Sequence, residues 1–328
     1  MEKSIKRIAV FTSGGDAPGM NAAIRAVVRT ANYYDLHVFG INRGYEGMIN
    51  GDLHRLDSRD VANIIHRGGT ILKTARSERF KTPEGRRAAY EALQAYDIDA
   101  CIAIGGDGTL TGAKIFCEEY PQIPFIGIPG TIDNDLFGTD YTIGYDTAVN
   151  TAVEAVDRIR DTADSHNRLF FIEVMGRNAG YIALSTAIGG GAEAVLLPED
   201  KLNIEELVTR LNLGAKKKKL FSVVIVAEGF MEGGAQEVAR LVNERFDYYD
   251  IKVTIIGHLQ RGGSPSRLDR LIASRLGFSA VELLLKGERN IMVGIVKNEI
   301  TGTSFEDAIT KSKAVNDELI RMAEILAT

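Results

Sequence analysis

The residues best suited to chemistry lie in one short stretch, Ile128–Asp135, which reads Ile-Pro-Gly-Thr-Ile-Asp-Asn-Asp. It follows an apolar run, Ile123–Ile128, that has the length and composition of a buried β-strand. The glycine leaves the backbone open to an anion, and the threonine adds a hydroxyl. An aspartate of ordinary pKa is ionised at neutral pH, so this stretch offers two candidates, Asp133 and Asp135, to accept a hydroxyl proton. Asp and Asn also favour turns, so a purely structural role for both carboxylates stays open.

Two glycine-rich segments could hold phosphate and metal. Ser13-Gly14-Gly15-Asp16 stands between a predicted strand and a predicted helix, where backbone N–H groups favour an anion. A simple tight turn is the alternative. Gly105-Gly106-Asp107-Gly108-Thr109 repeats this pattern with a carboxylate inside it, which suits Mg²⁺ shared with phosphate oxygens. The alternative there is Asp107 as a helix N-cap.

Several arginines could neutralise an anionic substrate. Arg168, Arg177 and Arg261 each lie beside a predicted strand end or a glycine-rich loop, near His166 or His258. Arg76 adds another within Thr-Ala-Arg-Ser. Guanidinium groups match phosphate oxygens in geometry and charge. Phosphoryl transfer needs positioning, Mg²⁺ and positive charge, and the sequence offers residues for all three.

Other chemistries find less support in the sequence. Neither Cys101 nor Cys117 has a polar, activating neighbourhood, and both are expected to be buried thiols. There is no G-x-S-x-G elbow and no H-x-x-x-H metal pair, and the segment after the first strand is not a G-x-G-x-x-G dinucleotide fingerprint.

The elements that must position these residues alternate along the chain as strand, loop and helix. This order predicts an α/β fold of two lobes, each a mainly parallel sheet flanked by helices, with a boundary near residue 145. Ligands in such folds bind at the carboxyl ends of strands, where these loops lie. The predicted strands are 8–12, 38–41, 100–104, 123–128, 170–174, 194–197, 222–227 and 253–256. The predicted helices are 20–33, the segment up to 119, 146–160, 266–286 and 304–326.

The composition of the chain limits the classes of protein to which it can belong. The chain has 328 residues, of which 45% are hydrophobic, so it can bury a large core. Its net charge of −5 argues against general nucleic-acid binding, because no excess of cations neutralises the phosphates. The two cysteines give no disulfide framework, no signal peptide is visible, and no apolar run spans a bilayer. We therefore expect a cytoplasmic location and no membrane partner.

Five motifs together resemble the bacterial ATP-dependent 6-phosphofructokinase family. They are residues 12–21, 105–109, 129–135, 175–177 and 257–265. The resemblance implies two α/β lobes: an ATP-binding lobe of 1–144 plus 260–310, and a sugar-phosphate-binding lobe of 145–259 plus 311–328. It implies transfer of the ATP γ-phosphate to the 1-hydroxyl of fructose 6-phosphate, with Mg²⁺ and ATP required, by a homotetramer with shared active sites.

The resemblance also implies a role for individual residues. Asp133 is the base, Asp107 holds Mg²⁺, and Thr131 and Arg177 steady the transferring phosphoryl group. The residues implied for ATP are Gly14, Tyr45, Arg76, Ser77, Gly106, Asp107, Gly108 and Thr109. Those implied for the sugar phosphate are Thr131, Asp133, Arg168, Met175, Gly176, Arg177, Glu228, Lys252, His258 and Arg261, with Arg168 reaching a neighbouring subunit. The family usually has arginine where this chain has Lys252, which keeps the charge but loses the bidentate fork.

Regulation and donor choice follow from the same resemblance. The effector residues implied are Arg25, Arg29, Arg160, Gly191, Glu193, Lys217 and Lys219, for activation by ADP and inhibition by phosphoenolpyruvate. Ser58 and Asn63 replace the usual Arg and Asp of that site. The run Lys216–Lys219 could equally be a solvated helix end.

Gly108 and Gly130 favour ATP over pyrophosphate, since pyrophosphate-using relatives carry Asp and Lys there. Two alternatives remain: a pyrophosphate-dependent enzyme, and a catalytically silent nucleotide or sugar-phosphate sensor.

Overall fold

The computed structural model describes residues 5–163, 168–199, 203–217 and 221–327. The chain divides into two compact units. The first comprises the chain up to Thr131, Leu136–Asp146 and Arg261–Lys313. The second comprises Ile132–Asp135, Thr147–Gln260 and the chain from Ala314. The assignment of ATP to one lobe and sugar phosphate to the other stays a prediction.

The first unit is built on a seven-stranded sheet in the order β11-β10-β5-β4-β1-β2-β3. Its parallel strands are β1 (Arg7–Thr12), β2 (His37–Ile41), β4 (Ala100–Gly105), β5 (Phe125–Pro129) and β10 (Ile291–Val296). The edge strands β3 (Leu53–Leu56) and β11 (Glu299–Ser304) pair antiparallel. All residues of β4 and β5 are buried, as expected for central strands with both faces covered.

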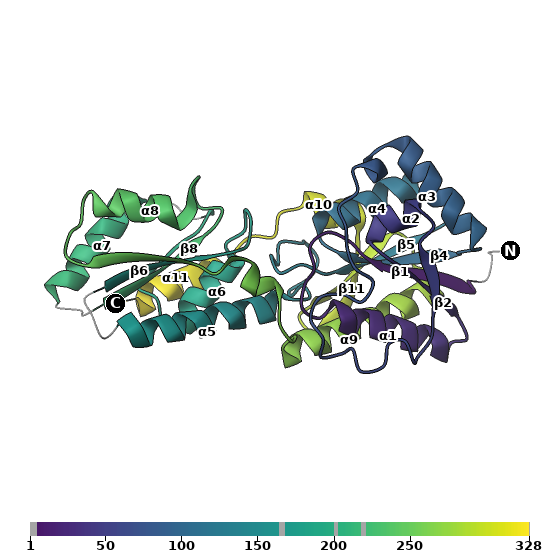
Figure 1. The fold of residues 1–328 in the computed structure, drawn as a ribbon, viewed down its shortest axis with the longest axis horizontal. Coiled ribbons are helices and arrows are strands. Elements are labelled where there is room, and N and C mark those ends of the chain that lie inside the picture. The colour runs from purple at the N-terminus through teal and green to yellow at the C-terminus, as the bar shows by residue number, and fades with distance from the viewer. Residues whose placement is uncertain (1–4, 164–167, 200–202, 218–220, 328) are drawn as a thin grey trace. The chain divides into compact units, whose positions relative to one another are not determined.

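Helices cover both faces of this sheet. Figure 1 shows α1 (Met20–Tyr33) and α9 (Arg267–Leu285) on one face, with α2 (Gly44–Ile49), α3 (Pro83–Ala95) and α4 (Asp107–Glu119) on the other. The short η1 (Arg79–Lys81) precedes α3.

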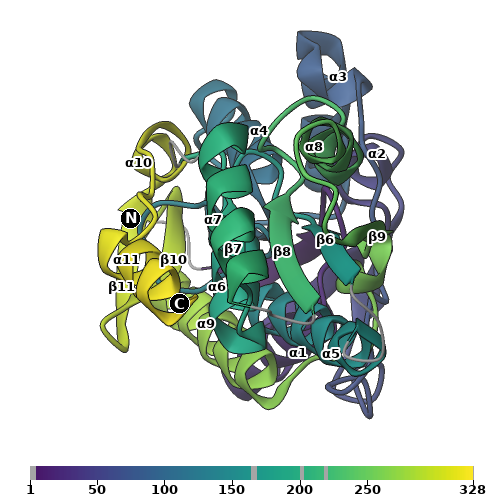
Figure 2. The ribbon, with the colours of Figure 1, turned by 90° about the vertical axis from the view of Figure 1, so that its left-hand side faces the viewer.

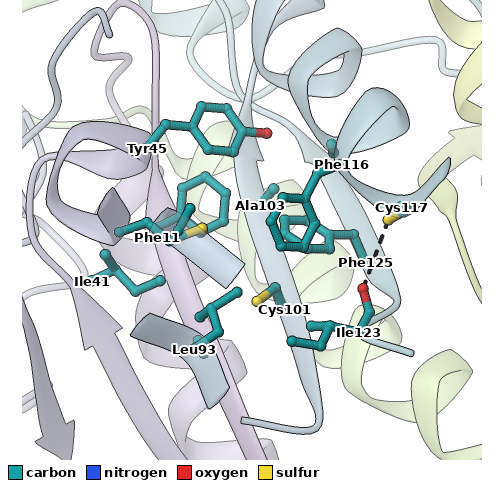
Figure 3. Packing of buried hydrophobic residues seen from close by; sticks show 14 of the residues in the cluster. Phe11, Ile41, Tyr45, Leu93, Cys101, Ala103, Phe116, Cys117, Ile123 and Phe125 are labelled. Atoms are coloured by element: carbon teal, nitrogen blue, oxygen red, sulfur yellow. Dashed lines mark hydrogen bonds between the residues drawn. The ribbon is translucent and has the colours of Figure 1, made fainter. Parts of the chain in front are cut away.

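The apolar core between the sheet and α2, α3 and α4 includes the aromatic rings of Phe11, Phe116 and Phe125 (Figure 3). Both cysteines are buried there as free thiols, as predicted. Burial raises the pKa of Cys117 to about 12, so it stays a thiol.

The second unit has a four-stranded parallel sheet in the order β7-β8-β6-β9 (Figure 2). Its strands are β6 (Arg168–Val174), β7 (Ala194–Leu196), β8 (Phe221–Ala227) and β9 (Asp250–Ile255). Its helices are α5 (Tyr145–Ala163), α6 (Tyr181–Gly190), α7 (Ile204–Lys216), α8 (Gly234–Asn243) and α11 (Asp317–Leu326). Figure 1 shows α7 and α8 on one face of this sheet and α5 and α6 on the other. The predicted α/β fold of two lobes with mainly parallel, helix-flanked sheets is confirmed.

The predicted helix 304–326 is wrong. The structure has α10 (Phe305–Thr310), an extended residue at Lys311, and a separate helix α11. The break falls where the chain leaves the first unit, at Lys313, and enters the second at Ala314. The stretch therefore forms two shorter helices, α10 in the first unit and α11 in the second.

The sequence reading also missed the β10–β11 hairpin. Lys297 and Asn298 turn it with φ of 50° and 67°, the two left-handed residues that a tight hairpin turn needs. Among the described residues, no helix has the length and apolar character needed to cross a membrane.

Candidate active site

Three of the predicted loops follow adjacent parallel strands of the first unit. Strand register pairs Thr12 with Ile104, and Gly105 with Pro129, so β1, β4 and β5 end side by side. Backbone hydrogen bonds continue this pairing into the loops, from Ser13 N to Ile104 O at 3.0 Å and from Gly130 N to Gly105 O at 2.9 Å. A Cβ added at Gly106 would lie 3.4 Å from the Thr131 Cβ. The sheet therefore brings the glycine-rich loops and Thr131 to one edge.

Asp107 occupies the first turn of α4, and the N-cap is Gly106. The alternative of Asp107 as the N-cap is therefore not what the structure has. Its carboxylate lies at the positive end of the helix dipole. The neighbouring Thr109 Oγ1 is buried without a hydrogen-bond partner in the part of the chain that the structure describes. Apart from its chain neighbours and the backbone of α4, no atom of the described residues lies within 4 Å of the place a Cβ on Gly108 would take, so this loop has an open side.

Tyr45 lies in the core of the first unit. It is 5% exposed, its ring stacks on Phe80 with centroids 3.9 Å apart, and its hydroxyl donates to Thr109 O at 2.6 Å. Burial raises the pKa of Tyr45 well above its ordinary value, so the hydroxyl stays a proton donor. Tyr45 therefore holds the backbone of the nucleotide loop predicted from the sequence.

A hydrogen bond connects the segment that carries Arg76 and Ser77 to the loop that follows β1. Thr74 donates to Gly14 O at 2.6 Å, which anchors the segment three residues before Ser77. The Ser77 hydroxyl donates to Glu46 Oε2 at 2.6 Å and, with Arg79, lowers the pKa of Glu46. Arg76 is exposed.

Arg261 contacts the β1 loop directly. It ends the short helix η2 (Gly257–Arg261), and its Nη1 donates to Asp16 O at 3.2 Å. A Cβ on Gly15 would come within 2.5 Å of that Nη1, so a residue larger than glycine would displace the guanidinium. His258, on the same helix, is exposed.

In the second unit, the predicted base and a predicted phosphate ligand form an ion pair. Arg177 Nε lies 3.4 Å from Asp133 Oδ2, and the Asp133 side chain is 2% exposed. Arg177 adopts left-handed backbone geometry with φ of 52°, directly after Gly176 with φ of 143°. Glu228 Oε1 accepts from both backbone amides, Gly176 N at 3.1 Å and Arg177 N at 2.7 Å.

Asp135 lies in the same loop as the predicted base. Its Oδ1 is a buried atom with no hydrogen-bond partner among the residues described, which leaves an acceptor for a water or cation.

Arg168 and Lys252 share one carboxylate that the sequence reading missed. Lys252 Nζ lies 2.9 Å from Asp250, and Arg168 Nε lies 3.7 Å from Asp250 Oδ2. The β6–β9 register places Arg168 opposite Asp250. The sequence did hold a local indication of the Asp250–Lys252 contact. Asp250 stands two residues before Lys252, so both side chains point to the same face of the strand.

A second missed residue is Gln260, which lies inside the quoted motif 257–265. Its amide accepts from Met175 N at 2.9 Å, so it contacts the start of the loop that carries Gly176 and Arg177.

The predicted effector residues fall on both units. Arg25 and Arg29 lie on α1, where burial and then the charge of Arg29 lower the pKa of Arg25. Ser58 accepts from Asn32 Nδ2 at 3.1 Å, and Asn63 has φ of 54°.

In the second unit, Arg160 donates to the carbonyls of Gly190 and Gly191, where α6 ends. Glu193 Oε2 accepts from Val223 N, and Glu193 and Lys217 line one cavity of about 340 Å³. Lys219 lies outside the described residues.

No group of three or more His, Cys, Asp or Glu side chains able to hold a metal occurs in the described part of the chain. Mg²⁺ in nucleotide sites usually takes one or two carboxylates together with substrate phosphate oxygens.

Comparison with known proteins gives a consistent result. The family model described as Phosphofructokinase matches residues 7–284. The chain is 56% identical over 322 residues to a protein of Cytophaga hutchinsonii named ATP-dependent 6-phosphofructokinase, covering 98% of each chain. A solved phosphofructokinase of Saccharomyces cerevisiae is similar with a TM-score of 0.88 and 38% identity, over 93% of this chain and 45% of that one. A pyrophosphate-dependent phosphofructokinase of Marinobacter aquaeolei gives a TM-score of 0.83 and 26% identity, over 96% and 86%. The chain therefore belongs to the phosphofructokinase family.

Proposed function

We propose that this chain is an ATP-dependent 6-phosphofructokinase, which transfers the ATP γ-phosphate to the 1-hydroxyl of fructose 6-phosphate. The observation that carries the proposal is the buried Asp133 paired with Arg177 at 3.4 Å. A relative 56% identical over almost the whole chain bears the same activity in its name. The product is fructose 1,6-bisphosphate.

In this mechanism Asp133 removes the proton from the 1-hydroxyl of the sugar. The O–H bond breaks, the proton moves to the carboxylate, and the oxygen forms a bond to the γ-phosphorus. The bond from that phosphorus to the β–γ bridging oxygen breaks, and ADP leaves. Because Asp133 is buried, bulk water is kept away from its carboxylate and does not compete with the sugar hydroxyl as proton donor.

Arg177 serves both ends of this transfer. Before reaction its guanidinium neutralises the Asp133 carboxylate. Once Asp133 carries the proton, that charge is gone, and Arg177 can stabilise the negative oxygens of the transferring phosphoryl group. The same arginine therefore compensates the charge before and after proton transfer.

The nucleotide loops fit ATP with Mg²⁺. Asp107 would hold the metal from the first turn of α4, next to backbone N–H groups that suit phosphate. Bound Mg²⁺ supplies positive charge to the phosphate oxygens. Gly14, Gly106, Gly108 and Thr109 would contact the phosphates, and Tyr45 would support them through the Thr109 backbone.

Packing at two glycines supports ATP as the donor over pyrophosphate. A Cβ at Gly130 would meet Ile104 Cγ2 at 3.1 Å and Met20 Cε at 3.2 Å, so a lysine there would need its neighbours to move. Gly108 borders open space that a side chain would fill. We infer that this space receives the remainder of ATP.

The experiment that tests the function is a kinetic comparison of wild type with Asp133→Ser. Turnover with ATP and fructose 6-phosphate should fall by about 10²–10⁴, the usual contribution of a general base, with little change in ATP affinity. Asp247→Ser, an exposed aspartate in the same unit, is the control. Near-normal turnover in Asp133→Ser would remove the assigned role. Activity with pyrophosphate alone would favour the pyrophosphate-dependent alternative, and ATP binding without any turnover would favour a sensor.

We also infer a homotetramer in which Arg168 reaches a neighbouring subunit's site, with ADP as activator and phosphoenolpyruvate as inhibitor. These inferences rest on the family resemblance of the residues named above. Sedimentation tests the assembly, and fructose 6-phosphate saturation curves with and without each effector test the regulation. A monomer with curves unaffected by either effector would contradict them.

A further inference from the structure

Gln260 is a fully buried amide that joins three distant segments of the second unit. It is 0% exposed. Its Nε2 donates to Ala148 O at 3.3 Å, in the first turn of α5, and its Oε1 accepts from Met175 N at 2.9 Å, after β6. These partners are 112 and 85 residues away in the sequence. A buried group whose donor and acceptor are both used this way fixes the relative placement of its partners.

The segment Met175–Arg177 depends on such bonds, because three successive backbone N–H groups in it have side-chain acceptors. Gln260 takes the first, and Glu228 Oε1 takes the next two. The left-handed geometry at Arg177 is unfavourable for a non-glycine residue and needs surrounding structure to maintain it. A Cβ on Gly229 would lie 2.0 Å from Arg177 O, so the segment also packs closely from the other side.

We propose that Gln260 is a positioning residue for phosphoryl transfer, acting through the Met175–Arg177 segment. By holding Met175 N, it fixes the backbone from which Arg177 reaches Asp133. This inference rests on the proposed function, since it assumes that Arg177 and Met175 act on the sugar phosphate and the transferring group. Only an amide, or a protonated carboxyl of the same length, can donate to Ala148 O and accept from Met175 N together.

The test is a double-mutant cycle of Gln260→Met and Arg177→Ala in the full-length protein. Gln260→Met keeps the side-chain length and removes both hydrogen bonds. We expect kcat/KM for fructose 6-phosphate to fall by about 5- to 150-fold, the equivalent of a buried polar group left unpaired, with the KM for ATP unchanged. If Gln260 acts through Arg177, Gln260→Met should add little in the Arg177→Ala background.

Two further variants keep the result interpretable. Gln260→Glu retains an acceptor for Met175 N and should lose less activity than Gln260→Met, which provides a measurement if the methionine variant folds poorly. Gln122→Met is the control, since Gln122 is exposed and its side chain donates to the Tyr90 hydroxyl at 2.6 Å.

Additive losses in the cycle, equal increases in both KM values, or unchanged kinetics in a folded Gln260→Met would overturn the inference and leave the proposed function intact. Wild type without turnover of fructose 6-phosphate would instead overturn the function, and this inference with it.

Discussion

Gly15→Ala should weaken binding of the sugar phosphate although Gly15 belongs to a loop predicted to bind ATP. A Cβ at this position would lie 2.5 Å from Arg261 Nη1 and 3.1 Å from its Cζ. Ordinary contact begins near 3.4 Å, so the guanidinium must retreat by about 1 Å. That movement breaks its hydrogen bond to Asp16 O, which is already 3.2 Å long. The glycine has no left-handed φ, so alanine costs little in backbone strain.

The expected increase in the KM for fructose 6-phosphate follows from the hydrogen bond that Arg261 would make with this substrate. A hydrogen bond between charged partners contributes about 1.5–3 kcal/mol, so its loss should raise the KM for fructose 6-phosphate by about 10- to 150-fold. The effect should fall on KM more than on kcat, because contacts to a non-reacting phosphate bind substrate and transition state alike. The KM for ATP should change much less, and the melting temperature should stay close to that of wild type.

The assay is steady-state kinetics over both substrates for wild type, Gly15→Ala, Arg261→Ala and the double variant. Gly15→Ala should have little further effect once Arg261 is removed, since its cost arises from displacing that side chain. The reasoning is refuted if Gly15→Ala leaves the KM for fructose 6-phosphate within about twofold of wild type. It is equally refuted if the two single variants add.

Three further predictions concern charged pairs. Arg86→Met should lower the free energy of unfolding by about 3–5 kcal/mol in a denaturant titration, because the 8%-exposed Arg86 makes a bidentate pair with Glu119 and also bonds two carbonyls of η1. A change under about 1 kcal/mol would contradict this. The Arg86 hydrogen bonds lower the pKa of Glu119 in the folded state, so the pair's contribution is present above the unfolded pKa and is lost as pH falls through the folded pKa. Acid unfolding of wild type and Arg86→Met should therefore converge at low pH, and a constant gap would argue otherwise. Lys252→Arg should lower the KM for fructose 6-phosphate with little gain in kcat, and Asp250→Asn should lower it by about 1.5- to 5-fold by releasing an exposed ion pair. A KM unchanged in both variants would place Lys252 away from the substrate.

The sequence predicted those features that depend on neighbouring residues. The apolar run before Gly105 and the glycines after it identify β4 and its loop, because burial on both faces selects consecutive apolar residues and tight turns select glycine. The predicted helix 304–326 failed because nothing local in that stretch records that the chain changes units at Lys313.

The sequence indicated a role for only some of the side chains discussed above. The family resemblance implied Tyr45 as a nucleotide contact, which stays a prediction, and the structure adds that its buried hydroxyl donates to the Thr109 carbonyl. Asp250 and Gln260 received no role, although Asp250 stands two residues before Lys252 and Gln260 lies within the motif 257–265. Arg168 as a partner of Asp250, and both partners of Gln260, were not apparent from the sequence, since register or packing brings them from segments far along the chain.

By itself, the sequence determined which groups are available: carboxylates at Asp107 and Asp133, glycine-rich backbone after two strands, and arginines in both halves of the chain. Only the tertiary structure decided which of these groups act on one another. Arg177 meets Asp133 from a left-handed backbone position whose amide donates to Glu228, and the preceding Met175 amide donates to Gln260. The physical reason is the distance along the chain over which each effect acts. Strand and turn preferences depend on a few neighbouring residues. Ion pairs and buried hydrogen bonds join residues that are far apart in the sequence until folding brings them together.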